Sequence, residues 1–199
     1  MELDSVFLSR HSFREYQDKD ISHEIISEIL DAAKYAPSAG NMQNWNFIVI
    51  RDKKKMTKLA EACLNQYWIS QAPILIVVCY DERSVKILFP EKTMEFSLQN
   101  NAIATTYLIL KATELGLGTC WVDIVKKDES ASLLKLPSHT IPTHLIALGY
   151  PKGTPKKTRK NDSRLVTFFE EYGNKKIDNS IFPLQKQFGK LKNKIKKKN

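Results

Sequence analysis

Hydrophobic positions repeat every three to four residues in five segments of the chain, which is the spacing of one face of an α-helix. These segments are residues 4–9, 22–36, 52–63, 93–115 and 128–135. All but the 93–115 segment open on Asp or Ser, residue types that cap helix N-termini. Pro37 ends the second segment, because the residue before a proline avoids helical geometry. Gly116 is expected to stop the longest helix.

Four other stretches are rich in β-branched and aromatic residues and are predicted to be strands. They are residues 45–50, 74–79, 120–125 and 144–148. The 74–79 run is apolar throughout, as expected for a central strand covered on both faces. Residues 81–92 are predicted to be polar and irregular, 152–164 to be a basic loop, and 165–172 to dock on another surface. Strands separated by helices, with one long helix, indicate an α/β or α+β sandwich.

Length and composition are those of an ordinary globular protein. The chain has 199 residues, which favours one domain, expected over residues 1–185, followed by a Lys-rich tail at 186–199. The 74–79 run is far shorter than the roughly 20 apolar residues that span a bilayer. No secretory segment is visible at the acidic N-terminus. We therefore expect no membrane association and a cytoplasmic location.

The net charge of +9 belongs mostly to the tail. Seven of the 31 basic residues follow Gln185, and the remaining 24 nearly balance 22 acidic residues. A uniformly basic face for nucleic acid is therefore not indicated. The three cysteines, Cys63, Cys79 and Cys120, lack the spacing of a disulfide framework or a zinc site, so we expect buried thiols in a reducing compartment.

Four segments carry candidate chemistry. Residues 10–14 (Arg-His-Ser-Phe-Arg) offer donors for a phosphate, although a solvated turn would look the same. Residues 36–45 bring small residues and amides that suit a heterocycle, or form only a polar connection. Residues 116–123 contain a Gly-x-Gly turn without a dinucleotide or P-loop fingerprint. The fourth segment is 149–151, followed by the basic residues 156–159, which either complete an anion site or form a solvated loop.

Catalytic side chains are poorly supported. The chain has no G-x-S-x-G and no H-E-x-x-H, and its four histidines lack metal-ligand spacing. His144 precedes an apolar strand and is expected to be a hydrogen-bonded core residue. If the chain is an enzyme, a cofactor should carry the reactive chemistry.

Taken together and in this order, the four segments resemble the nitroreductase family of FMN-dependent oxidoreductases. The resemblance covers everything except the Lys-rich tail. It implies an α+β fold, a three-layer α/β/α sandwich with a central mixed or antiparallel sheet flanked by helices. It also implies a homodimer with FMN at the interface and a domain-swapped C-terminal segment that wraps the partner.

The resemblance also assigns site residues. By similarity, Arg10, Ser12 and Arg14 hold the FMN phosphate and ribityl chain, and Arg159 closes on the phosphate from the other side. Pro37 and Ser38 would approach the cofactor, and Asn41 would face the flavin ring from the partner subunit. Asn65 would place an amide at the pyrimidine edge of the ring. The 121–123 backbone would run past the ring, where its amide hydrogens could bond N5. The full cofactor set is Arg10, His11, Ser12, Arg14, Pro37, Ser38, Asn41, Asn65, Trp121, Val122, Asp123 and Arg159.

Two departures from the family pattern stand out. His11 occupies a position where a second arginine is common, so one charge beside the phosphate would depend on pH. Asn44 replaces a usual proline and thereby frees a backbone donor.

The reaction implied is hydride transfer from NADH or NADPH to flavin N5, then reduction of an electron-poor small molecule such as a nitroaromatic or a quinone, in a ping-pong sequence. No catalytic side chain and no metal are expected. One alternative keeps the fold but changes the reaction to dehalogenation or flavin reduction, with residues 81–95 as a lid that decides the substrate. Another is a non-catalytic flavin- or anion-binding protein whose basic tail binds nucleic acid non-specifically.

Overall fold

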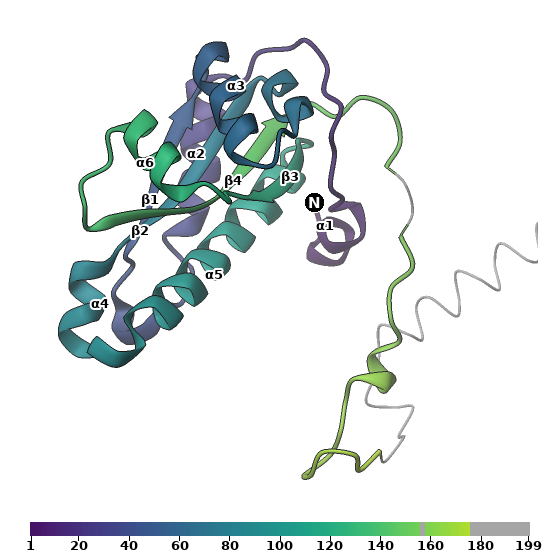
Figure 1. The fold of residues 1–199 in the computed structure, drawn as a ribbon. Coiled ribbons are helices and arrows are strands. Elements are labelled where there is room, and N and C mark those ends of the chain that lie inside the picture. Colours follow the sequence, from purple (N-terminus) through teal and green to yellow (C-terminus); the bar gives the residue numbers. More distant parts are fainter. Residues whose placement is uncertain (156–157, 176–199) are drawn as a thin grey trace, which may run out of the picture. The chain divides into compact units, whose positions relative to one another are not determined.

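The computed structural model describes residues 1–155 and 158–175 of the chain, which divides into two units, Met1–Pro155 and Lys156–Asn199. Figure 1 labels the helices and strands of the first unit. The α-helices are α1 (Leu3–Ser9), α2 (His23–Ala33), α3 (Lys53–Ala62), α4 (Glu82–Leu88), α5 (Thr93–Glu114) and α6 (Lys127–Leu134). The strands are β1 (Trp45–Ile50), β2 (Ile74–Asp81), β3 (Gly118–Asp123) and β4 (Thr140–Gly149). Short 3-10 turns are η1 (Ala39–Asn41), η2 (Tyr67–Gln71) and η3 (Pro90–Lys92).

The strands form one sheet in the order β1-β2-β4-β3, and every neighbouring pair is antiparallel. A mixed or antiparallel sheet was predicted, and the described strands form an antiparallel one. β2 and β4 are central, which explains why most of their residues are buried on both faces. β1 and β3 are the edge strands, and they lie roughly 14 Å apart at the usual spacing between strands.

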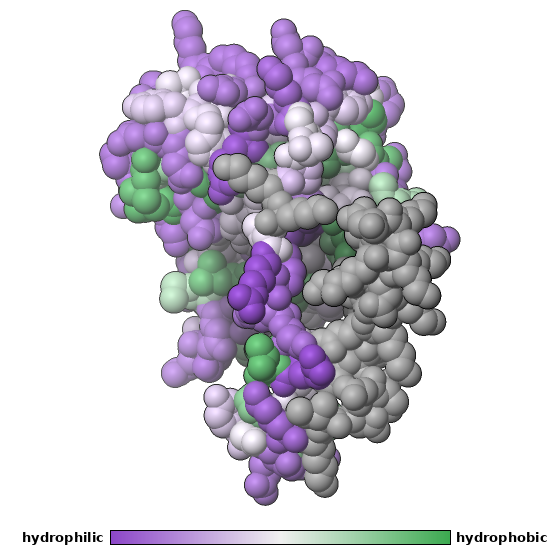
Figure 2. Space-filling model, turned by 90° about the vertical axis from the view of Figure 1, so that its right-hand side faces the viewer, coloured by the Kyte–Doolittle hydropathy of each residue, from purple (hydrophilic) through white to green (hydrophobic). Residues whose placement is uncertain are grey.

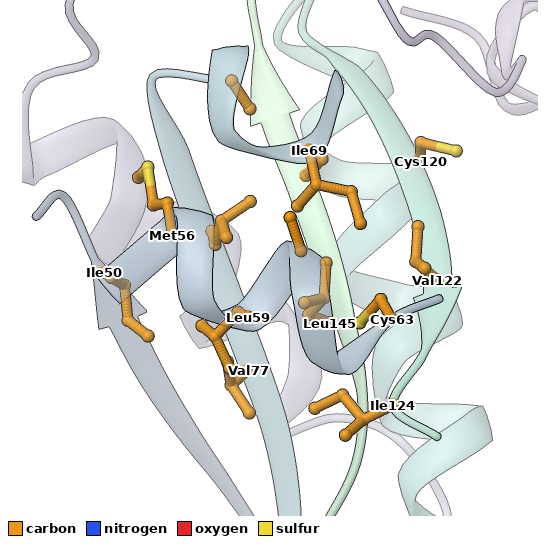
Figure 3. Close-up of a cluster of buried hydrophobic side chains, with 14 of the residues drawn as sticks. Ile50, Met56, Leu59, Cys63, Ile69, Val77, Cys120, Val122, Ile124 and Leu145 are labelled. Carbon is orange, nitrogen blue, oxygen red and sulfur yellow. The ribbon is translucent and has the colours of Figure 1, made fainter. Parts of the chain in front are cut away.

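Helices cover both faces of the sheet and give the three layers that were predicted (Figure 1). On one face α3 and η2 pack Met56, Leu59 and Ile69 against Leu75 and Leu145. Figure 3 shows this cluster, to which α3 contributes Met56 and Leu59 and the edge strand β3 contributes Cys120 and Val122. On the other face α2 and α5 cover the alternate side chains of β2 and β4. The α+β fold is thereby confirmed.

Several local predictions are confirmed by backbone geometry. The Ser22 hydroxyl accepts from the backbone N–H of Ile25 at 3.4 Å, and the Asp52 carboxylate accepts from Lys55 N–H at 3.0 Å. Gly116 ends α5 with φ +77°, a conformation that glycine adopts without strain. The caps expected at residues 4 and 128 are wrong, because both aspartates lie inside the first helical turn, where a negative charge favours the helix dipole.

The irregular stretch predicted at residues 81–92 is wrong, since it contains α4 and η3. The Asp81 carboxylate caps α4 by accepting from Arg83 N–H at 2.9 Å. α4 buries only Val85, so its hydrophobic repeat is too weak to be read from the sequence. The long helix predicted at 93–115 is confirmed to within one residue.

Three strands differ in extent from the prediction, and the smallest difference is that β2 continues to Asp81. β3 spans Gly118–Asp123 rather than 120–125, and β4 is about twice as long as the predicted 144–148. Pro142 lies within β4, where proline normally argues against a central strand. The pairing with β2 is irregular between Val78 and Cys79, and this irregularity accommodates the proline.

The second unit is described from residue 158 to residue 175. It contains a 3-10 turn at Ser163–Leu165 and a ring contact of 4.5 Å between Phe168 and Tyr172. The side chains of Leu165, Val166 and Tyr172 are exposed. The predicted tail at 186–199 and its boundary lie outside the described residues, so the division at 185 stays a prediction. Among the helices described, none is long and apolar enough to cross a membrane.

Candidate functional site

The arginine-bearing segment, residues 10–14, is fastened to the start of the edge strand β3. Phe13 N–H donates to the Thr119 carbonyl at 2.9 Å, and Ser12 forms an isolated parallel bridge with the same residue. The Tyr16 hydroxyl donates to the carbonyls of Phe13 at 2.7 Å and Ala147 at 3.2 Å. Burial raises the pKa of Tyr16, so its hydroxyl remains a donor. These bonds fix the backbone that carries Arg10 and Arg14.

Two glycines make this attachment possible. A Cβ on Gly118 would lie 2.9 Å from the Phe13 ring, and a Cβ on Gly149 would lie 2.6 Å from the Tyr16 ring and 2.7 Å from Pro73. Gly118 and Gly149 are paired across β3 and β4. Both rings therefore pack directly on the sheet backbone, which no other residue type would allow without movement. This gives a physical reason for glycine in the 116–118 and 149–151 motifs.

The two guanidinium groups of the segment are not neutralised by neighbouring carboxylates. Arg51, Arg83 and Arg164 each pair with an aspartate. Within the described ranges, by contrast, no carboxylate lies within ion-pair distance of Arg10 or Arg14. Arg14 instead lies with its guanidinium carbon 5.5 Å from the centroid of the Trp68 ring. Two cations without internal counterions favour an external anion here.

The outer edge of β3 supplies further hydrogen-bonding groups. Ile124 N–H donates to Thr143 of β4, whereas the Thr119 carbonyl accepts from Phe13 on the opposite side. Because such bonds alternate along an antiparallel strand, Trp121 and Asp123 direct their backbone groups to the free edge. Val122 faces Leu145 and buries its side chain. Of the three residues predicted to line the ring, Trp121 and Asp123 alone therefore offer backbone donors there.

The C-terminal end of α3 lies beside the end of β3. The Ala62 carbonyl accepts from the backbone N–H of Val125 at 3.2 Å and of Lys126 at 3.1 Å. Asn65 follows shortly after, is exposed, and has φ +57°. Non-glycine residues held in this left-handed conformation are enriched at functional sites. Because the resemblance predicts that they share one site, we group Asn65 with Arg10, His11, Ser12, Arg14, Trp121, Val122 and Asp123 and call these residues the edge group.

A buried polar chain supports β3 from the α5 side. The His144 ring stacks on Trp121 with centroids 3.7 Å apart and accepts or donates hydrogen bonds to Thr105 at 2.8 Å and Thr143 at 2.9 Å. Burial lowers the pKa of His144 to about 4, so the ring is neutral near pH 7. The Trp121 indole donates to Asp123 Oδ1 at 2.8 Å. His144 is the hydrogen-bonded core residue that was predicted, and it also backs the edge strand.

Pro37, Ser38 and Asn41, which we call the loop group, lie elsewhere, next to the opposite edge strand β1. Asn41 has φ +56°, and its side-chain oxygen accepts from Gln43 Nε2 at 3.0 Å. Gly40 packs against the side chains of Leu88 and Phe89 at the end of α4. The loop group therefore lies next to α4 rather than next to Arg10 and Arg14.

A network of buried amides holds the loop group in place. Asn100 Oδ1 accepts from Ala39 N–H at 2.8 Å, and Asn100 Nδ2 donates to Asn44 Oδ1 at 2.8 Å. Asn44 Nδ2 donates to the Asp81 carbonyl and to Ser97 Oγ, both at 2.9 Å. Asn44 and Asn100 are almost completely buried. Asn44, the departure from the family's proline, therefore joins the end of β2, where α4 begins, to α5 through its side chain.

The predicted site residues thus fall into two groups on opposite edges of the sheet. Arg159 belongs to the second unit and is exposed, so its predicted closure on the phosphate stays a prediction. Sequence reasoning missed Trp68 and the Asn44–Asn100 pair as residues that hold site elements. Asn44 had a usable signal, because an amide replaced a proline directly after the loop. Trp68 had none, since one aromatic residue in a polar stretch is unremarkable.

Comparisons with known proteins identify the family of the chain. The model of the family described as "Nitroreductase family" matches residues 8–150. The chain belongs to the nitroreductase family. It is 35% identical over 151 residues, covering 74% of this chain and 76% of the relative, to a putative NADH dehydrogenase/NAD(P)H nitroreductase of Methanothermobacter thermautotrophicus. Membership makes this chain an oxidoreductase.

Solved structures of the same fold resemble it closely. NfrA2 of B. megaterium matches with a TM-score of 0.80 and 27% identity over 87% of this chain and 76% of that chain. An FMN-dependent nitroreductase of Clostridium difficile matches with a TM-score of 0.71 and 28% identity over 84% of this chain and 98% of that chain. These similarities support the nitroreductase fold that the sequence predicted.

Proposed function

We propose that this nitroreductase family member binds FMN, takes electrons from NADH or NADPH, and passes them to an electron-poor small molecule such as a nitroaromatic or a quinone. The two half-reactions would alternate at one site in a ping-pong sequence. The observation that carries the proposal is the pair of guanidinium groups, beside the edge of β3, that have no carboxylate partner among the residues the structure describes. A cytoplasmic location is part of the same proposal.

The residues of the edge group fit FMN on chemical grounds. A phosphate monoester needs several cationic or hydroxyl donors close together, and Arg10, Ser12 and Arg14 offer them on one short segment. A flavin ring needs donors and acceptors along its polar edge. The outward backbone groups of Trp121 and Asp123 and the amide of Asn65 supply both kinds.

Each part of the edge group has a distinct task in this proposal. FMN, when bound, supplies the hydride chemistry at N5 that no side chain of the protein can supply. Arg10, Ser12 and Arg14 bind the phosphate and so determine where the cofactor lies. The N–H groups of the β3 edge orient the ring and favour electron density on it. Trp121, stacked on the buried His144, keeps that edge rigid.

The loop group would come from a second copy of the chain. Within one copy, β1 and β3 are separated by the width of the sheet, so Asn41 and Arg10 belong to opposite edges. A homodimer would bring the loop of one copy to the edge group of the other. Hydrophobic patches interrupt the mostly hydrophilic surface in Figure 2, and the exposed Leu3 and Phe7 of α1 offer apolar area for such a contact. The exposed apolar residues of the second unit suit the predicted wrapping of the partner.

The predicted lid at residues 81–95 spans α4, η3 and the start of α5. Ile87, Leu88 and Met94 are exposed apolar side chains in this region. Since Leu88 and Phe89 pack on the loop group, α4 would form an apolar wall beside the ring. An apolar wall favours a planar, hydrophobic acceptor over a charged one.

The test is the visible spectrum of the purified protein before and after NADH or NADPH is added without oxygen. We expect flavin absorbance, or its appearance when FMN is added, and bleaching by at least one nicotinamide. R10Q should weaken FMN binding at least tenfold, whereas K58Q, which removes one exposed charge from α3, should not change it. A protein that binds no FMN refutes the proposal.

The alternatives give different results in the same experiment. Bound flavin that neither nicotinamide bleaches would indicate a non-catalytic flavin-binding protein. Rates with a nitroaromatic, a quinone, a halophenol and free flavin as acceptors separate the proposed reaction from dehalogenation and flavin reduction. Nucleic-acid binding by residues 186–199, which lie outside the described residues, would be lost when the tail is deleted and would leave bleaching unchanged.

A further inference from the structure

Trp68 is the side chain that contacts the guanidinium of Arg14. The guanidinium carbon lies 5.5 Å from the centroid of the Trp68 ring, inside the limit of about 6 Å for a cation–π interaction. In the described part of the chain, no carboxylate pairs with Arg14. Its position in the protein is therefore set by an aromatic face, which leaves its N–H groups available to a ligand.

Trp68 is itself held firmly enough to serve as this support. It lies in the η2 turn, where the next residue, Ile69, is completely buried in the core cluster shown in Figure 3. Gln66 fixes the start of the turn by donating from Nε2 to the Cys63 carbonyl at 2.9 Å. Trp68 packs against the same core cluster as a partly buried side chain. The turn thus presents one face of the indole while the core fixes the other parts.

The backbone of Arg14 is fixed independently from the sheet side. Phe13 N–H is bonded to Thr119, and the Phe13 carbonyl accepts from Tyr16. Trp68 packs against the cluster on the α3 face of the sheet, so the guanidinium that lies over its ring is on the α3 side of β3. Arg14 therefore extends from an anchored backbone onto an anchored ring.

We propose that Trp68 is a positioning residue, which stacks on Arg14 and holds its guanidinium ready for the phosphate of FMN. The inference rests on the proposed function, because it takes Arg14 to be a phosphate ligand. A free arginine side chain loses considerable rotamer freedom when it binds an anion. Stacking in the protein alone removes part of that freedom beforehand, so binding becomes tighter without any new contact to the ligand.

The test is a double-mutant cycle on the dissociation constant of FMN, measured by titrating FMN into the cofactor-free full chain and following its fluorescence. The four proteins are the unmodified chain, W68L, R14Q and the double variant. W68L should weaken binding about three- to tenfold, and W68F, which keeps an aromatic face, should stay within about twofold of the unmodified chain. In the R14Q background the W68L change should cost less than about twofold, because there is no guanidinium left to position.

The matched control is Y67L, which removes the neighbouring, exposed ring of the same turn and should leave FMN binding unchanged. Circular dichroism and thermal melting show whether each variant is folded. Equal losses from W68L with and without R14Q would overturn the inference and indicate that Trp68 contacts the flavin or only supports the fold. Equal effects of W68F and W68L would overturn it as well. Both outcomes are distinct from failure of the proposed function, in which the unmodified chain binds no FMN.

Discussion

Removing the Asn44 amide should destabilise the protein strongly, because it is the centre of the buried network beneath the loop group. The side chain donates to the Asp81 carbonyl and Ser97 Oγ and accepts from Asn100 Nδ2. In N44A the part-buried Asp81 carbonyl and the buried Asn100 Nδ2 each lose the Asn44 partner, and each group left unpaired costs about 1–3 kcal/mol. With the small cavity that remains, we expect the free energy of unfolding to fall by about 3–5 kcal/mol.

Urea unfolding followed by circular dichroism measures this loss. N46A is the matched control, since Asn46 lies two residues further on, in β1, but is exposed, and its replacement should change stability by less than about 0.5 kcal/mol. Hydrogen exchange of the peptide around Ala39 should also accelerate in N44A, because Asn100 loses the partner that orients it. A loss below about 1 kcal/mol, or a loss equal to that of N46A, would show that the network does not act as described.

Three further predictions follow from buried groups. G149A should destabilise the protein by about 1–3 kcal/mol, measured as a lower melting temperature, because the new Cβ would meet Tyr16 and Pro73; an unchanged melting temperature would contradict the close contact. The pKa of His144 falls from 6.5 unfolded to about 4 folded, so stability should be full above pH 6.5 and decline by up to about 3 kcal/mol toward pH 4. H144Q should make that decline shallower, and an identical slope would argue against it. Burial raises the pKa of Cys79 to about 12, so a thiol reagent at pH 8 should label it only after unfolding.

The fold was largely readable from the sequence because its strongest signals are local. The uniformly apolar 74–79 strand and the caps at Ser22 and Asp52 depend only on residues close together in the sequence, and the structure confirms them. α4 was not readable, since it buries one side chain and depends on a cap at the end of a strand. The true length of β4 was hidden by Pro142, because the register irregularity that tolerates it is a property of two paired strands.

The candidate site was readable as residue types but not as an arrangement. The composition of residues 10–14 indicated an anion site. Their attachment to Thr119, by contrast, depends on strand pairing that no local sequence pattern encodes. The contact between Arg14 and Trp68 joins residues from distant parts of the chain. The division into an edge group and a loop group follows from the strand order, which sequence patterns leave open.

That division has a genetic consequence. If each functional centre takes its arginines from one copy and its Asn41 loop from another, then two inactive variants damaged in different halves can rescue each other. A mixed pair of R10Q and N41A chains would contain one centre that carries both defects and one that carries neither. Co-expression of the two variants would then restore up to half of the activity per mixed pair, although each variant alone is impaired.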